Sequence, residues 1–342
     1  MFCEFIVKDK NCKFKSKFNY LSKNYCTRHY NIIQKSLNNN NENNNNNENN
    51  NDNENNNDND KLIILKKKLN MNNILYDSIE YLNKGTYNEV YLVKYQNNNF
   101  IIKYQDIQNN KNILYYEYIL LSNIFNNHNN IVKLYSNNSK NYFYEKDKYA
   151  ILLEEYLNYT LDLKKEKYIF LINDILDIAI QLIKTIKYIH NNKYLYIDLK
   201  PQNIMFIDEN TMNIKLVDFN LCDKYINIYS EFYPNIKLNN RKGNDLFSSR
   251  NINKGFRGQR SDDIESILYI ILYLLDDSLF KELYNQKNIQ NIISIKESIF
   301  MNTLHEYQFI KLFILEINKI LTIEHKKPNY NKLIDILIQA KQ

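Results

Sequence analysis

The order of apolar patterns along the chain is the sequence feature that most restricts its fold. Runs of strand length come first, and they are Ile79–Leu82, Glu89–Tyr95, Phe100–Tyr104, Ile131–Tyr135 and Tyr149–Tyr156. Asn112–Ile124 is a helix predicted among them. Between Phe170 and Ile189, apolar residues then recur every three or four positions, and Asp262–Leu275 is another apolar helix. The pattern predicts an α+β protein with a β-rich half followed by an α-rich half.

The composition divides the chain into three zones. Residues 1–36 are basic and aromatic and contain three of the four cysteines. Residues 37–60 are almost entirely Asn with a few Glu and Asp, and because they have nothing apolar to bury, we expect a disordered linker. Residues 61–342 have ordinary globular patterning. We therefore expect a folded domain joined by a flexible linker to a small amino-terminal module.

Residue usage and charge indicate the source of the protein, its binding partners and its location. Gly and Pro number only 4 and 3, whereas residues with AT-rich codons are abundant, so we expect a large DNA virus or an AT-rich protist as the source. The net charge of +6 permits an acidic partner without requiring nucleic acid. We find no apolar run of about 18 residues and no signal-peptide layout, so we expect no membrane span. An intracellular location, cytoplasmic or nuclear, and free thiols are expected.

Four polar residues share one chemistry. Asp198 is followed two positions later by Lys200 and five positions later by Asn203, and Asp218 comes shortly afterwards. Phosphoryl transfer needs this set, because one carboxylate orients the hydroxyl nucleophile and an ammonium neutralises the moving phosphate. An amide and a second carboxylate hold Mg²⁺. An incidental polar loop is the alternative, but Asp-Leu-Lys-Pro-x-Asn arises by chance very rarely.

Tyr196–Asn203 resembles the catalytic loop H-R-D-x-K-x-x-N of eukaryotic-type protein kinases, and Asp218-Phe219-Asn220 lies where D-F-G is expected. The resemblance implies the two-lobed protein kinase fold, with the N-lobe at about residues 76–156 and the C-lobe at about 157–342. ATP and Mg²⁺ are the implied cofactors. The implied roles are those of a catalytic base for Asp198, a stabiliser of the transferred phosphoryl group for Lys200, and Mg²⁺ ligands for Asn203 and Asp218.

The segment Leu82–Val90 resembles the phosphate-binding loop G-x-G-x-x-G-x-V of the same family. Only Gly85 and Val90 match, since Asn83 and Asn88 replace the outer glycines. Asn tolerates a left-handed backbone better than other non-Gly residues, so we expect the turn to form. By this resemblance Asn83, Gly85 and Val90 contact the nucleotide, and an ordinary hairpin turn is the alternative.

Phe100–Lys103 resembles the V-A-I-K strand of protein kinases, in which the Lys reaches the α- and β-phosphates of ATP. Glu117 on the following helix is its expected partner. A solvated strand lysine is the alternative interpretation of Lys103. The same comparison places Glu154, an unusual polar residue, at the gatekeeper position before the hinge.

Three later segments resemble the casein kinase I group, which includes the vaccinia-related kinases. They are Gly243–Ser249 for G-T-x-x-[FY]-x-S, Arg260–Ile267 for R-x-D-D-L-E-S-L and Lys327–Leu333 for K-P-D-Y-x-x-L. The resemblance covers about residues 76–340. Together with Lys200 it implies a serine/threonine protein kinase acting on protein substrates. Asp263 would tie its helix to the catalytic loop, and His190 would be structural.

Two departures from the family pattern affect the predicted activity. Ile197 replaces the Arg before the catalytic Asp, so no basic residue is present there to clamp a phosphorylated activation loop. Asn220 replaces the Gly of D-F-G. With the altered glycine loop, these departures leave open a pseudokinase that binds nucleotide without efficient transfer.

Six cations crowd the segment that would bind substrate, and they are Arg241, Lys242, Arg250, Lys254, Arg257 and Arg260. Because Arg offers bidentate geometry for phosphate or carboxylate, we expect an anion site for acidic or already phosphorylated substrates. A solvated basic loop is the alternative.

The amino-terminal zone contains a candidate zinc site made of Cys3, Cys12, Cys26 and His29. Cys26 and His29 form C-x-x-H, a common half-site, and three thiolates with one imidazole suit a structural Zn²⁺ site. Three scattered thiols are the alternative. Residues 1–36 could also bind single-stranded nucleic acid through their basic and aromatic side chains. Cys222 is expected to be a packing residue.

Overall fold

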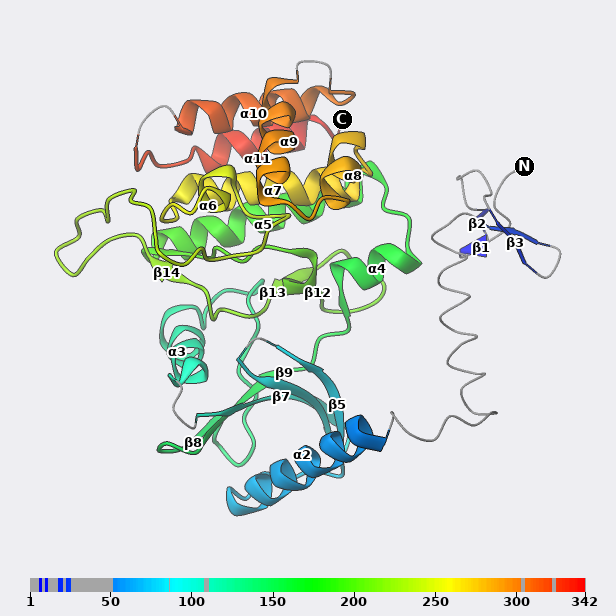
Figure 1. Ribbon diagram of the computed structural model, residues 1–342, viewed down its shortest axis with the longest axis vertical. Helices are drawn as coiled ribbons and strands as arrows, with labels where there is room; N and C mark the ends of the chain where they lie inside the picture. Colours follow the sequence, from blue (N-terminus) through cyan, green and yellow to red (C-terminus); the bar gives the residue numbers. More distant parts are fainter. Residues whose placement is uncertain are drawn as a thin grey trace. The chain divides into compact units, whose positions relative to one another are not determined.

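The computed structural model describes residues 6–7, 10–11, 18–20, 23–25, 52–85, 87–107, 111–302, 305–321 and 324–341. The chain divides into two units, Met1–Lys68 and Leu69–Gln342, which are considered separately. In the first unit two antiparallel strand pairs are described. They are β1 (Ile6–Val7) with β2 (Lys10–Asn11), and β3 (Phe18–Tyr20) with β4 (Lys23–Tyr25) (Figure 1).

Helix α2 (Asp52–Met71) begins inside the segment expected to be a disordered linker. Residues 52–60 are therefore helical, and the expectation of disorder was wrong for them. The physical reason is that the Leu- and Lys-rich second half of α2 forms a helix readily, and a helix once begun extends cooperatively. Residues 37–51 lie outside the described part of the chain.

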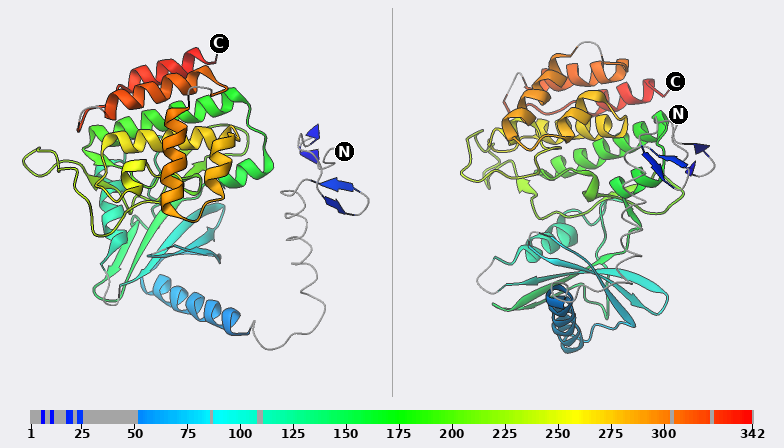
Figure 2. Two further views of the ribbon diagram at one scale, coloured as in Figure 1. Left: turned by 45° about the horizontal axis from the view of Figure 1, so that its top comes forward. Right: turned by 45° about the vertical axis from the view of Figure 1, so that its right-hand side comes forward.

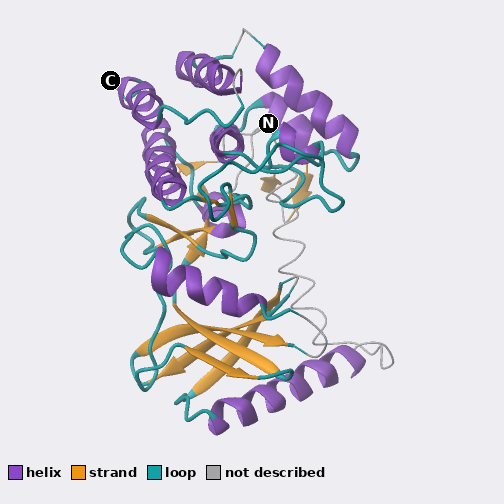
Figure 3. Ribbon diagram, turned by 90° about the vertical axis from the view of Figure 1, so that its left-hand side faces the viewer, coloured by secondary structure: helices purple, strands orange, loops and turns teal. Residues whose placement is uncertain are grey.

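The second unit begins with a five-stranded antiparallel sheet in the order β5-β6-β7-β9-β8. Its strands are β5 (Ser78–Lys84), β6 (Glu89–Tyr95), β7 (Asn98–Asp106), β8 (Tyr142–Glu145) and β9 (Tyr149–Glu155). Helix α3 (Ile113–Ile119) starts at the N-cap Asn112 and continues into a π-helical turn, Leu120–Ile124. Figure 3 shows α3 along one side of the twisted sheet.

The strand expected at Ile131–Tyr135 is not present. This segment makes only isolated bridges, from Ile131 to Leu216 and from Leu134 to Glu154. Its backbone groups bond alternately to two different partners, since Val132 N–H donates to Leu216 and Tyr135 N–H to Leu153. An apolar run divided between two neighbours in this way is buried without forming a regular ladder.

The rest of the unit is mainly helical and surrounds two buried helices, α5 (Ile172–Asn191) and α7 (Arg260–Leu274) (Figure 2). Both belong to one large apolar core. Other helices are α4 (Leu161–Lys167), α6 (Arg250–Asn253), α8 (Ser278–Tyr284), α9 (Ile289–Met301), α10 (Gln308–Leu321) and α11 (Tyr330–Gln339). The described helices include none with both the length and the apolarity to cross a bilayer.

Short strands at the edge of the helical part position the polar loops. β10 (Tyr159–Thr160), β12 (Ile204–Phe206) and β13 (Ile214–Leu216) form one small sheet, and β11 (Tyr194–Leu195) pairs with β14 (Asp223–Lys224). The polar residues 196–203 and 217–222 lie in the connections between these strands. The two connections are therefore held next to each other by the small sheets.

Candidate active site

Asp198, Lys200 and Asn203 lie in the loop between β11 and β12, and their side chains contact one another. Lys200 Nζ lies 2.6 Å from Asp198 Oδ2, and Asn203 Nδ2 donates to the same oxygen at 3.1 Å. Asn203 Nδ2 also donates to the main-chain oxygen of Asp198 at 2.9 Å. Asp198 and Asn203 are buried, while Lys200 is half-buried. The structure thus gathers a carboxylate, an ammonium and an amide in one loop.

Asp263 of α7 holds the backbone of this loop. Its carboxylate is only 1% exposed and accepts hydrogen bonds from the N–H groups of Tyr196 and Ile197, both at 2.8 Å. Ile197 has a φ of 72°, a left-handed conformation that strains a β-branched residue. Bonds to a charged acceptor are strong enough to hold such a strained backbone. They therefore determine the direction of the side chain of the next residue, Asp198.

His190 completes this anchor. Its Nε2 lies 2.8 Å from Asp263 Oδ2, and its Nδ1 lies 2.7 Å from the Tyr330 hydroxyl oxygen. Burial lowers the pKa of His190, which favours the neutral ring. A neutral ring satisfies both contacts when Nε2–H donates to Asp263 and Nδ1 accepts from Tyr330. His190 and Asp263 thus both have the structural contacts that sequence analysis expected.

Lys103 on β7 lies between two buried carboxylates. Its Nζ is 2.8 Å from Glu117 Oε1 on α3 and 2.9 Å from Glu154 Oε1 on β9. Burial alone would lower the pKa of Lys103, but Glu117, Glu154 and Asp218 outweigh burial and raise it. Glu117 Oε1 also accepts the N–H of Phe219 at 2.9 Å. One network therefore joins the sheet, α3 and the Asp218-Phe219 segment.

Burial sets the protonation of the two glutamates. It raises the pKa of Glu154 to about 7, although Lys103 acts in the opposite direction. It also raises the pKa of Glu117, again against the effect of Lys103. One ammonium, that of Lys103, faces two buried carboxylates, so the three side chains together would carry a negative charge if both carboxylates were ionised. These carboxyls therefore keep protons more readily than exposed ones do.

Asp218 and Asn203 are the residues that could hold a divalent cation. Asp218 is half-buried and accepts a long hydrogen bond of 3.4 Å from the N–H of Asn220. Asn203 uses Nδ2 for Asp198, which leaves Oδ1 as its atom for a metal. A carboxylate and an amide oxygen are donors that suit Mg²⁺. Among the described residues no group of three or more His, Cys, Asp or Glu is placed to hold a metal.

The β5–β6 hairpin contains the predicted phosphate-binding residues. Gly85 N–H donates to the main-chain oxygen of Asn88 at 2.8 Å and closes the turn. Val90 pairs with both Asn83 and Lys103, so the hairpin is in register with the lysine strand. Neither Asn83 nor Asn88 has a positive φ, so tolerance of a left-handed backbone does not explain these substitutions. The turn instead closes through an ordinary main-chain hydrogen bond.

Residues 76–340 match the family model of the protein kinase domain. The chain belongs to the protein kinase family. A solved structure of vaccinia related kinase 3 has a similar fold, with a TM-score of 0.64 and 14% sequence identity over 78% of this chain and 89% of that chain. Membership implies protein substrates and the use of ATP and Mg²⁺, and the donor set at Asp218 and Asn203 fits such a metal.

Asn244 is a residue of this kinase site that sequence reasoning missed. Its Nδ2 donates to Asp198 Oδ1 at 3.2 Å and to the Leu199 main-chain oxygen at 3.3 Å. Its Oδ1 accepts from the N–H of Phe247 at 2.6 Å. Asn244 therefore joins the catalytic loop to the segment Gly243–Ser249. Its place at the Thr of G-T-x-x-[FY]-x-S was the available signal, but the contact with Asp198 depends on tertiary structure.

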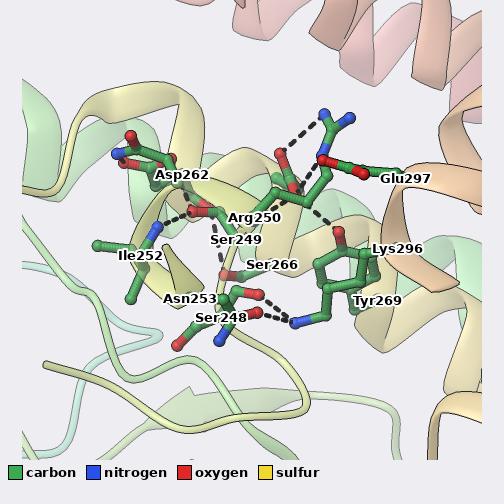
Figure 4. Close-up of polar contacts among 12 residues, drawn as sticks. Ser248, Ser249, Arg250, Ile252, Asn253, Asp262, Ser266, Tyr269, Lys296 and Glu297 are labelled. Atoms are coloured by element: carbon green, nitrogen blue, oxygen red, sulfur yellow. Dashed lines mark hydrogen bonds and ion pairs between the residues drawn. The ribbon is translucent and has the colours of Figure 1, made fainter. Parts of the chain in front are cut away.

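Arg250, expected to belong to an anion site, has a structural role. Its Nε lies 3.0 Å from Glu265 Oε1, which also accepts the Tyr269 hydroxyl at 2.6 Å. In the same region Lys296 of α9 donates to Asn253 Oδ1 at 2.6 Å (Figure 4), and burial lowers the pKa of Lys296 to about 7. These contacts attach α6 and its loop to α7 and α9.

The other five cations also have partners. These pairs are Arg241 with Asp245, Lys242 with Asp223, Lys254 with Glu297, Arg260 with the main-chain oxygen of His325, and Arg257 with the Tyr233 ring. The six residues therefore do not form a single uncompensated anion site, because the fold supplies each with its own partner. The pairs of Arg241 and Lys242 are partly exposed, and exposed pairs contribute little stability.

The remaining sequence predictions concern the cysteines and the amino-terminal zone. Cys222 is buried in the core, as a packing residue would be. The expected zinc ligands lie outside the described residues, and they are Cys3, Cys12, Cys26 and His29. The zinc site and nucleic-acid binding by residues 1–36 therefore stay predictions.

Proposed function

We propose that this protein is an active serine/threonine kinase that transfers the γ-phosphate of ATP to protein hydroxyls. The observation that carries the proposal is the assembly of Asp198, Lys200 and Asn203 in one loop, beside Asp218 and the Lys103–Glu117 pair. Phosphoryl transfer depends mainly on positioning and charge stabilisation. The required charges are present, and those of Asp198, Lys200 and Lys103 each contact a buried partner.

In this proposal each residue has a task. Asp198 orients the substrate hydroxyl and accepts its proton, while Asn244 and Asn203 restrain the carboxylate. Lys200, 2.6 Å from Asp198, neutralises charge on the transferred group. Lys103 binds the phosphates of ATP. Bound Mg²⁺ would neutralise phosphate charge, with Asn203 and Asp218 as its protein ligands.

A pseudokinase is the second candidate, and particular observations favour it. The phosphate-binding loop retains Gly85 but has Asn83 and Asn88 instead of the outer glycines. Asn220 occupies the Gly position after Asp218 and Phe219. Against this candidate, five residues that carry the chemistry are all present and in contact with partners, and they are Lys103, Glu117, Asp198, Asn203 and Asp218.

Phosphate transfer from ATP to casein, measured with and without Mg²⁺, tests the proposal. Mg²⁺-dependent transfer to Ser and Thr, identified by mass spectrometry of the product, is the expected result. ATP binding without transfer to casein or to a mixed peptide library would instead favour the pseudokinase. Transfer confined to Tyr would contradict the specificity inferred from Lys200 and the casein kinase I resemblance.

Activity should not require phosphorylation of the activation segment. Ile197 takes the place of the clamping Arg and packs with Leu195, Tyr225 and Ile226 in an apolar cluster. Apolar packing thus holds the segment where other kinases use a phosphate–Arg contact. Protein made in bacteria and treated with phosphatase should keep at least about half the kcat of untreated protein, since no charge pair is lost. A fall of tenfold or more after phosphatase treatment would show that a phosphate is needed.

We also propose that the enzyme prefers acidic or already phosphorylated substrates, through two of the six cations only. Arg241 and Lys242 immediately precede the segment that contacts Asp198, and their carboxylate partners are about half exposed. A substrate with Asp, Glu or phosphoserine near the acceptor could compete for these cations. We also propose that residues 1–36 form a structural zinc module in an intracellular kinase.

A further inference from the structure

Lys103 has a second carboxylate partner that the usual pairing with the helix glutamate does not include. Glu154 Oε1 lies 2.9 Å from Lys103 Nζ, and the Glu154 side chain is only 4% exposed. The contact is an ion pair without the directed geometry of the Lys103–Glu117 hydrogen bond at 2.8 Å. Both carboxylates are therefore close enough to hold the same ammonium.

The two partners belong to different parts of the N-lobe. In the pairing of β7 with β9, Ile101 faces Glu154 and Lys103 faces Leu152, so Lys103 and Glu154 are diagonal neighbours on one face of the sheet. Glu117 instead lies on α3, which reaches the sheet through side-chain packing by residues such as Leu114. The Glu154 contact is thus internal to a hydrogen-bonded sheet, whereas the Glu117 contact depends on where α3 lies.

Burying a second carboxylate here has a cost that needs compensation. Lys103 is the cation in contact with Glu154, and Glu117 and Asp218 add negative charge nearby. A buried carboxylate without a partner is strongly unfavourable, and an apolar side chain would avoid that cost. The ion pair with Lys103 is the compensation that the structure shows.

We propose that Glu154 is a positioning residue that anchors Lys103 to the sheet independently of α3. The inference rests on the proposed nucleotide-binding role of Lys103 and extends it. Lys103 then stays in the site when the Glu117 contact is lost, because the neighbouring strand still holds its ammonium. Loss of both anchors leaves Asp218 as the remaining carboxylate that acts on the buried Lys103, so the effect of burial grows and the pKa of Lys103 falls.

A double-mutant cycle with Glu117→Gln and Glu154→Gln tests this inference through two measurements. The first is the rate at which an amine-acylating reagent labels Lys103 without nucleotide, followed by mass spectrometry, since a lysine with a lower pKa reacts faster. The second is the dissociation constant for Mg²⁺-ATP, with kcat measured separately from KM. Glu155→Gln is the matched control, because Glu155 is the next residue on β9 but pairs with Lys215.

Each single variant should change labelling and ATP affinity modestly, while the double variant should exceed the product of the single effects by about tenfold. The double variant of Glu117→Gln with Glu155→Gln should show only the product of its two single effects. Glu154→Met in the Glu117→Gln background gives a second test if the Gln variant folds poorly, because Met has no polar group to leave unpaired. Independent effects of the two changes, or tighter ATP binding after Glu154→Gln alone, would overturn the inference. Since labelling needs no catalysis, a protein that never transfers phosphate would refute the proposed function and still leave this test decisive.

Discussion

Replacing Asp198 with Asn should reduce kcat for phosphate transfer by about a thousandfold, with little change in ATP affinity. The amide keeps the size of the side chain and can still accept hydrogen bonds. It cannot accept the substrate proton, and it loses the charge that lies 2.6 Å from Lys200 Nζ. Transfer to casein gives kcat, and titration calorimetry with Mg²⁺-ATP gives the affinity.

Asp276→Asn makes the same chemical change away from the site. Asp276 pairs with Lys165 at the surface and has a φ of 56°, a conformation that Asn tolerates well. This control should keep the full rate. If the Asp198→Asn protein retained more than a tenth of the activity, a different residue would have to act as the base.

Replacing Asp263 with Ala should reduce both stability and activity. The change leaves the N–H groups of Tyr196 and Ile197 and the Nε2–H of His190 without their buried acceptor. We expect the free energy of unfolding to fall by about 4 kcal/mol, as hydrogen bonds to a charged group are lost. Ile197 would then relax from its positive φ and displace Asp198, so kcat of the folded fraction should fall at least about tenfold. Urea unfolding and transfer assays on the same preparation measure the two effects.

Asp262→Ala is the matched control for this second prediction. Asp262 is buried on the same turn of α7 but accepts from Ser249 Oγ at 2.7 Å and Asn251 Nδ2 at 2.9 Å, not from the catalytic loop. It should lower stability without lowering kcat of the folded fraction. The anchoring role of Asp263 would be rejected if both variants lost stability equally and neither changed kcat.

Local spacing accounts for the parts of this protein that sequence could predict. Asp198, Lys200 and Asn203 occupy one loop, so a short stretch of chain already places them together. Periodicity likewise predicted α5 and the strands around Lys103, because burial of one face of an element leaves a regular apolar pattern. It was less reliable where one segment has two partners, as at Ile131–Tyr135.

Contacts between distant segments were decided by the tertiary structure. Glu154 meets Lys103 across 51 positions because β9 lies beside β7, and Asn244 meets Asp198 across 46 positions through the fold of the C-lobe. The arginine cluster shows the same limit, since its members are close in sequence yet have separate partners. An apolar pattern indicates that one face of an element is buried, but it does not indicate which other element packs against that face. The sequence by itself determined the kind of fold and the chemistry of the loop, whereas packing decided which charges face one another.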